Sequence, residues 1–144
     1  MSISPPPSRL AELPRTECLR LLARTSFGRV GITTGDEVPI IRPVNYVFDE
    51  RSQSVAFRTA PGTKLHALVA ARRAVFEIDG VDPGSRTGWS VIVSGVAEEV
   101  VSPGERRRLD GLGLEVWAPG DRSHWLRIRV RVVSGRRIEL APDG

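Results

Sequence analysis

The 144-residue sequence has few of the residues that most often define a site by themselves. Its single cysteine, Cys18, excludes an internal disulfide and fits a reducing compartment. One cysteine and two distant histidines, His66 and His124, cannot complete a closed zinc site, so no metal is expected. No apolar run approaches the length of a membrane span, and the N-terminus has no signal-peptide core. We therefore expect a cytoplasmic protein that does not contact a membrane.

Aromatic residues make up only 6% of the chain, which leaves few rings on which nucleic-acid bases could stack. The net charge of +4 is compatible with nucleic acid, with a phosphorylated cofactor, or with an arginine-rich surface that binds neither. Apolar content of 40% and charged content of 26% are typical of a globular domain. We expect residues 1–8 to form a disordered tail and residues 9–144 to form a single domain.

Two helices can be placed from their start and stop signals. The first is expected to start with Thr16 as its N-cap and to end near Gly28. Its apolar face carries Cys18, Leu21 and Leu22. The second is expected to start with Ser102 as its N-cap and Pro103 at its first position.

Much of the remaining sequence alternates between apolar and polar residues, which is typical of β-strands. The segment VPIIRPVNYVF, residues 38–48, contains Pro39 and Pro43 and is therefore expected at a sheet edge, a bulge or a strand end. The segment GWSVIVSGVAEEV, residues 88–100, is apolar on both faces, which predicts burial on both sides.

The C-terminal part of the sequence gives the most regular alternation. Residues 125–133, WLRIRVRVV, place Leu126, Ile128, Val130 and Val132 on one side and arginines on the other, and Ser134-Gly135 predicts a turn into a closing hairpin. Together the patterns predict a mainly β fold, a barrel of six or seven strands with an N-terminal helix and short connecting helices.

Lysine is the basic residue that the chain almost lacks, because Lys64 stands against twenty arginines. Lys64 follows a predicted strand and a Pro61-Gly62 turn, in the expected first turn of a helix capped by Thr63. A helix N-terminus has free N–H donors and a partial positive charge, so a cation there is unfavourable unless an anion binds. Arg58 and Thr59 could close over the same anion. The alternative is that Lys64 and Arg58 are simply solvated.

Four segments together resemble the pyridoxamine 5′-phosphate oxidase-like family of flavin-binding split barrels. They are GRVGITTGDEVPIIRPVNYVFDE, SVAFRTAPGTKLHAL, AVFEIDGVD and GWSVIVSGVAEEV. The R-T-x-x-G-T-K block and the G-W-S-V strand are the most specific parts, and the resemblance extends from the first helix to the closing GRRI segment. It implies a split-barrel homodimer with two FMN sites at the subunit interface.

The resemblance also implies which residues contact FMN. They are Arg58, Thr59, Thr63 and Lys64 around the phosphate, Pro43, Val44 and Asn45 along the isoalloxazine ring, Trp89 and Ser90 from the long strand, and Arg136 and Arg137 from the closing hairpin. The last two arginines could come from either subunit.

The implied activity is that of a flavin-dependent oxidoreductase, which passes hydride or electrons from NADH or NADPH to a small-molecule acceptor. No side chain is assigned a catalytic role. The chain is shorter than the true oxidase, and its Arg122-Ser123-His124 matches the oxidase's Arg-x-His spacing but lies in a loop before the last strand. We interpret that match as a coincidence and do not expect pyridoxamine-phosphate oxidation.

Three alternatives stay open from the sequence. The first is a deazaflavin-dependent reductase of the same fold, and the second is a barrel that binds flavin without turnover. The third is a nucleic-acid-binding barrel that tracks phosphates with the arginine stripe Arg127, Arg129 and Arg131, although such a stripe is also typical of a solvated edge.

Overall fold

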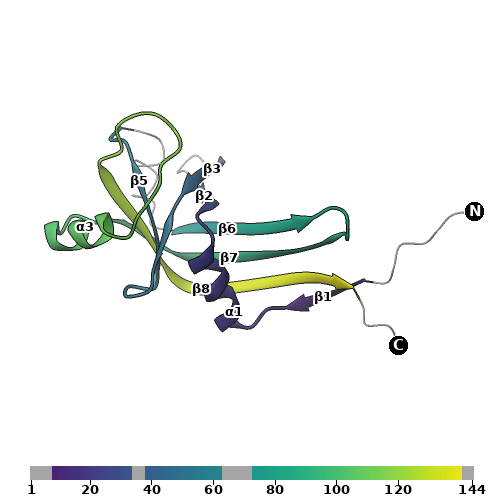
Figure 1. The fold of residues 1–144 in the computed structure, drawn as a ribbon. Helices are drawn as coiled ribbons and strands as arrows, with labels where there is room; N and C mark the ends of the chain where they lie inside the picture. The colour runs from purple at the N-terminus through teal and green to yellow at the C-terminus, as the bar shows by residue number, and fades with distance from the viewer. Residues whose placement is uncertain (1–7, 34–37, 63–72, 141–144) are drawn as a thin grey trace, which may run out of the picture.

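A single antiparallel sheet forms the frame of the molecule (Figure 1). The computed structural model describes residues 8–33, 38–62 and 73–140, and these ranges contain eight strands and two helices. The elements are β1 (Ser8–Glu12), α1 (Arg15–Arg24), β2 (Phe27–Thr33), β3 (Pro39–Asn45), β4 (Val47–Asp49), β5 (Ser54–Thr59), β6 (Arg73–Asp82), β7 (Thr87–Glu99), α3 (Pro103–Asp110) and β8 (His124–Leu140). Neither helix has the length or the apolar character needed to cross a membrane.

The strand order shows how the sheet curls into a barrel. The strands follow the order β3-β2-β6-β7-β8-β5-β4, with β1 paired to the far part of β8. The two edge strands, β3 and β4, are separated in the chain only by Tyr46, so the sheet has bent until its edges approach each other. Beyond the curled part, β6, β7, β8 and β1 continue as a projecting arm (Figure 1). The predicted mainly β split barrel is confirmed, and β3 is the expected edge strand.

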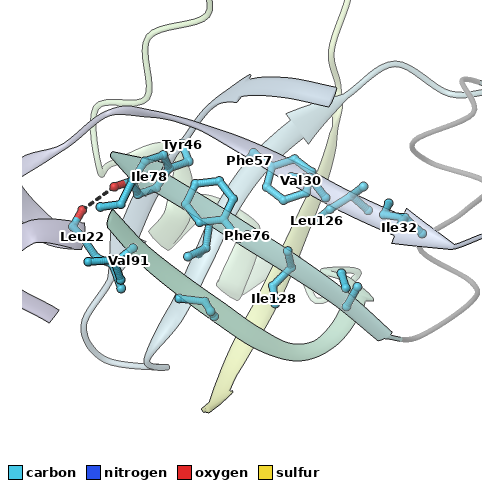
Figure 2. Packing of buried hydrophobic residues seen from close by; sticks show 14 of the residues in the cluster. Leu22, Val30, Ile32, Tyr46, Phe57, Phe76, Ile78, Val91, Leu126 and Ile128 are labelled. Atoms are coloured by element: carbon cyan, nitrogen blue, oxygen red, sulfur yellow. Dashed lines mark hydrogen bonds between the residues drawn. The ribbon is translucent and has the colours of Figure 1, made fainter. Parts of the chain in front are cut away.

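The core fills the concave side of this sheet (Figure 2). Helix α1 closes it with the predicted face, and Cys18, Leu21 and Leu22 are all buried. Tyr46 fixes the helix to the sheet, because its hydroxyl donates to the Leu22 carbonyl at 2.7 Å and its ring packs edge-on against Phe76 at 4.7 Å. Burial raises the pKa of the Tyr46 hydroxyl above its usual range, so this group belongs to the core.

The predicted ends of the first helix were wrong. The helix starts after Pro14 as N-cap and ends at Arg24, with the extended Thr25 as C-cap. Pro14 has a φ of −65° and an extended ψ of 156°, and it makes no side-chain hydrogen bond of the kind that the expected Thr16 cap would have supplied. Gly28 lies inside β2, where a Cβ would stand 2.3 Å from the Phe76 ring, so it permits close packing and does not stop the helix. The Ser102 cap of α3 is confirmed.

The predicted turn at Ser134-Gly135 was also wrong. Strand β8 continues from His124 to Leu140, because β7 pairs with it from Leu126 to Ile138, across the predicted turn. A Cβ at Gly135 would stand 2.7 Å from the Cys18 sulfur, so this glycine allows α1 to approach the sheet. Ser8, which the sequence assigned to the tail, starts β1, an unpredicted strand paired with the end of β8. Residues 1–7 lie outside the described residues.

A register shift in β8 turns part of its apolar face outward. Ser94 pairs with Val132 and Gly95 pairs with Val130, so Arg131 is an extra residue and the alternation reverses there. Val132 is consequently 62% exposed, although the alternation predicted it on the same side as Leu126 and Ile128, which are buried. Ile92 of β7 is 45% exposed, so the predicted burial of β7 on both sides is wrong within one chain.

Candidate functional site

A cavity of about 570 Å³ lies between the ends of β3 and β5 and the connection between α3 and β8. We call this connection, residues 111–123, the covering loop. The lining side chains that carry polar or aromatic groups are Phe27, Arg42, Asn45, Arg58, Thr59, Trp117 and Arg122. An irregular connection as long as the covering loop is uncommon inside a small domain and usually has a function.

Three buried polar atoms point to a ligand at this cavity. Asn45 Nδ2, Arg58 Nε and Thr59 Oγ1 are buried without a hydrogen-bond partner among the described residues, and all three residues line the cavity. A buried polar atom left unsatisfied costs about 1–3 kcal/mol, so such atoms rarely gather without a reason. The group offers two N–H donors and a hydroxyl to an incoming molecule.

The charge of the cavity is positive. Arg58 places its guanidinium 5.4 Å from the centroid of the Trp125 ring, and Arg42 and Arg122 line the same cavity. None of the described lining residues carries a carboxylate. Three guanidinium groups for which the described residues supply no acidic partner favour an anionic ligand, and arginine matches the geometry of phosphate oxygens.

The covering loop is fixed against the barrel at Trp117. The Trp117 backbone N–H donates to Asn45 Oδ1 at 3.0 Å, and its indole stacks on the Phe27 ring at 5.3 Å with an interplanar angle of 11°. Two glycines with positive φ, Gly113 at +78° and Gly120 at +114°, shape the loop on either side, and such angles favour glycine. The loop therefore forms a defined wall of the cavity.

The structure brings five of the residues implied by the resemblance to one place. Pro43, Val44 and Asn45 from β3 and Arg58 and Thr59 from the end of β5 all line the cavity. Two others implied for the phosphate, Thr63 and Lys64, lie outside the described residues.

The remaining four predicted residues lie elsewhere within one chain. Trp89 pairs with Arg137 and Ser90 with Arg136 across β7 and β8, on the projecting arm. Trp89 and Arg137 line a separate hollow at that arm, and Arg137 is 3.5 Å from a Glu17 carboxylate oxygen. These four residues are therefore not part of the cavity formed by a single chain.

Among the polar and aromatic residues that line the cavity, sequence reasoning missed Phe27, Arg42 and Trp117, and it considered Arg122 only in a spacing that it interpreted as a coincidence. The one available signal was a tryptophan in the glycine- and proline-rich stretch LGLEVWAPG, where a buried strand or helix is not expected. Arg122 and His124 are not brought together at the cavity, because His124 lies at the start of β8 and contacts Glu99 Oε1 at 2.5 Å through Nδ1.

Two of the three arginines of the β8 stripe are paired with neighbouring carboxylates. Arg127 donates to Glu98 at 2.6 Å and to Glu105 at 3.0 Å, and Arg129 donates to Glu98 at 2.8 Å. Paired arginines have less charge available for nucleic-acid phosphates. Within the described ranges no cluster of three His, Cys, Asp or Glu side chains is arranged to hold a metal ion.

Comparison with known proteins gives a consistent result. Residues 14–137 match the family model of pyridoxamine 5′-phosphate oxidase. An uncharacterized protein of Mycobacterium tuberculosis is 38% identical over 135 residues, which cover 90% of this chain and 86% of that protein.

Solved structures show the same fold. The FAD binding protein from Mycobacterium smegmatis is 36% identical with a TM-score of 0.75, covering 88% of this chain and 98% of its own. A conserved protein of unknown function from Corynebacterium diphtheriae is 35% identical with a TM-score of 0.74, covering 88% of this chain and 96% of its own.

Proposed function

Because this chain belongs to the pyridoxamine 5′-phosphate oxidase family, we propose that it binds a flavin in the cavity beneath the covering loop and acts as an oxidoreductase. The observation that carries the proposal is the group of unsatisfied buried atoms on Asn45, Arg58 and Thr59 in one positively charged cavity. The similarity to an FAD binding protein at 36% identity supports a flavin as the ligand.

The chain's own residues suit the parts of a flavin nucleotide. The Arg58 guanidinium would bind a phosphate, with the Thr59 hydroxyl donating beside it. Thr63 and Lys64 remain predicted phosphate ligands. Asn45 Nδ2 would donate to an acceptor on the isoalloxazine ring, which would lie along Pro43, Val44 and Asn45.

When bound, the flavin supplies hydride transfer, which none of the lining side chains can carry out. The covering loop would shield the cavity from water, and the arginines would hold the anionic part of the cofactor. The proposed reaction takes hydride or electrons from NADH or NADPH and delivers them to a small-molecule acceptor. It does not include the oxidation of pyridoxamine phosphate.

We further propose that the protein acts as a homodimer. Ile41, Val75, Ile92 and Val132 form an exposed apolar group on the outer face of the sheet. Gly31 of β2 pairs with both Ile41 of β3 and Val75 of β6. Ser94 of β7 pairs with both Val75 and Val132 of β8, so the group extends across five adjacent strands. An apolar surface of this kind is typical of an interface, and a partner's arm could carry Trp89, Ser90, Arg136 and Arg137 to the cavity. Val132→Asp should shift the mass measured by light scattering from dimer to monomer.

The flavin proposal is tested first by the visible spectrum of the purified protein and by mass spectrometry of what heat releases. Arg58→Ala should weaken flavin binding about 100-fold, because it removes charged hydrogen bonds to the phosphate. Arg24→Ala is the matched control, since Arg24 is an exposed arginine in the last turn of α1 and does not line the cavity. A protein that takes up no FMN, FAD or deazaflavin would contradict the proposal.

Turnover needs its own measurement. Anaerobic addition of NADH or NADPH should bleach the flavin band, and a panel of quinones, nitro compounds and oxygen should restore it. A bound flavin that neither donor reduces would show a binding protein without this activity.

A further inference from the structure

The ring of Trp125, at the start of β8, lies against the Arg58 side chain. Trp125 is 2% exposed, and it stands directly opposite Arg58 in the register of β5 and β8. The Arg58 guanidinium is 5.4 Å from the centroid of the ring, close enough for a cation to be attracted to the electron-rich face of an indole. The buried Arg58 Nε has no hydrogen-bond partner within the described ranges, so the ring is the group of the chain that orients this side chain.

Asp110, the last residue of α3, fixes the orientation of that ring. The Trp125 Nε1–H donates to Asp110 Oδ1 at 2.7 Å. Arg106, four residues before Asp110, donates to the Ser123 carbonyl at 3.0 Å. Residues four apart lie on the same face of a helix, so α3 holds the start of β8 at two points. An anionic acceptor also polarises the indole toward negative charge, which favours a guanidinium at its face.

The position of Asp110 in the helix gives a second reason to ask what its carboxylate does. The C-terminus of a helix carries a partial negative charge, so an acidic side chain in the last turn is unfavourable there. Arg107 and Arg108 in the same turn have the favourable sign, and Asp110 does not. The hydrogen bond to Trp125 accounts for an acid at this place, and through Trp125 it leads to the cavity.

We propose that Asp110 and Trp125 are positioning residues for the phosphate of the flavin. Asp110 orients the Trp125 ring, and the ring holds the Arg58 guanidinium in the place where the phosphate binds. The guanidinium is then ordered before the ligand arrives, so the ordering of this side chain is not subtracted from the free energy of binding. The inference rests on the proposed flavin-binding function, and it adds two residues that do not line the cavity.

The test compares FMN with riboflavin, which has the same ring system but no phosphate, by titration of the flavin-free protein. Asp110→Ala should weaken FMN binding about tenfold, the order expected when one charged hydrogen bond loses its alignment, and should leave the riboflavin affinity unchanged. Asp110→Asn keeps an oxygen that accepts from Trp125 and should retain most of the FMN affinity. Trp125→Phe keeps a ring face without Nε1 and should resemble Asp110→Ala. Glu50→Ala is the matched control, because Glu50 is an exposed carboxylate outside the cavity lining.

A double-mutant cycle separates positioning from a general effect on the fold. In an Arg58→Ala background, Asp110→Ala should cause no further loss of FMN affinity, because Asp110 acts only through Arg58. A spectroscopic readout needs no flavin. In the NMR spectrum of isotope-labelled, flavin-free protein, the Arg58 Nε–H signal should shift in Asp110→Ala and return in Asp110→Asn. Urea unfolding shows whether each variant is folded, and Trp125→Phe takes the place of Asp110→Ala in the cycle if the latter is not.

The outcomes distinguish the positioning role from the flavin binding on which it rests. An equal loss of FMN and riboflavin affinity in Asp110→Ala, or an equal loss of FMN affinity with and without Arg58, would overturn the positioning role and leave flavin binding intact. Unchanged FMN affinity in both Asp110→Ala and Trp125→Phe would overturn it as well. A wild-type protein that binds no flavin would overturn the proposed function, and this inference with it.

Discussion

The side chains of Arg58 and Arg127 project from the same face of two paired strands, but only Arg127 has carboxylate partners among the described residues. Arg58 of β5 pairs with Trp125 of β8, and Arg127 follows two residues later, so both side chains project to one side. Arg127 donates to carboxylates of Glu98 and Glu105 at 2.6 and 3.0 Å. Arg58 meets the Trp125 ring, and its buried Nε has no partner among the described residues.

The surroundings of Arg127 belong to an ionic cluster that the chain completes by itself. Arg108 of α3 joins it, donating to both carboxylate oxygens of Asp49 at 2.7 Å and to Glu105 at 2.8 Å. The Arg108 guanidinium holds the pKa values of Asp49 and Glu105 at about 2, well below their usual range. This cluster ties α3 to the sheet and needs no ligand.

The comparison teaches how to distinguish a structural arginine from a binding one. Where the fold is complete, each buried charge has partners from the chain, because an unpaired one is costly. Where the chain supplies buried donors and the described residues supply no acceptors, as around Arg58, the arrangement supports the proposed ligand as the missing partner. The alternation of the strands does not distinguish Arg58 from Arg127, because both alternate with apolar residues, and only the R-T-x-x-G-T-K block singles out Arg58 in the sequence.

The largest expected effect is on stability, from Asp49→Ala in the ionic cluster. Asp49 is 2% exposed, and its loss leaves the Arg108 guanidinium without its main partner. We expect the free energy of unfolding to fall by about 3 kcal/mol, as for other buried pairs that lose one member. Urea unfolding measures it, with Glu50→Ala at the neighbouring exposed position as control. An unchanged midpoint would show that the cluster does not anchor α3.

The next largest expected effect is the difference in stability between the Arg127→Ala and Arg58→Ala variants. Arg127→Ala should destabilise the flavin-free protein by about 2 kcal/mol, because Glu98 and Glu105 each lose a charged hydrogen bond. Arg58→Ala should change its stability by no more than about 0.5 kcal/mol, because only the contact with the Trp125 ring is lost. Chemical unfolding of both flavin-free variants tests the difference. Equal losses would mean that Arg58 is a structural residue like Arg127.

The ionic cluster also predicts how stability depends on pH. The folded-state pKa of Asp49, about 2, is lower than the ordinary value of 3.8, so its contribution is present above about pH 4 and is lost as the pH falls toward 2. The shift corresponds to about 2 kcal/mol. Asp49→Asn should flatten this part of the curve of unfolding free energy against pH. An acid profile that is identical in the variant would assign the acid sensitivity to other carboxylates.

Much of the fold could be predicted because alternation and caps are local signals. Three of the failures, two at glycines and one at a bulge, have tertiary causes. Gly28 and Gly135 were interpreted as a helix stop and a turn, but they are glycines because Phe76 and Cys18 approach too closely for a Cβ. The contacts are tertiary, so no local pattern could reveal them. The bulge at Arg131 could not be predicted from a local pattern either, because only the pairing of β8 with β7 shows that the alternation reverses there.

The residues of the candidate site also include some that the sequence could indicate and some that it could not. Asn45, Arg58 and Thr59 lie in continuous segments whose residue types could be recognised, and the structure brings them to one cavity. The stacked pair Phe27 and Trp117 joins the start of β2 to the covering loop, which is far away in the sequence. Neither side chain is charged, so neither residue type indicates a binding site by itself. Folding, and not spacing, creates that part of the cavity.

The smallest expected effect tests whether burial, and not the number of ion pairs, separates the two regions. Arg129 also binds Glu98, at 2.8 Å, but it is 49% exposed, and Glu98 keeps Arg127 when Arg129 is removed. Arg129→Ala should therefore cost about 0.5 kcal/mol or less, an effect that 0.5 M salt should largely remove. Arg127→Ala, measured in the same salt series, should keep most of its effect, because Arg127 is only 11% exposed. If the two variants lose equal stability and respond equally to salt, the ionic cluster behaves as a surface feature, and the contrast with Arg58 cannot rest on burial.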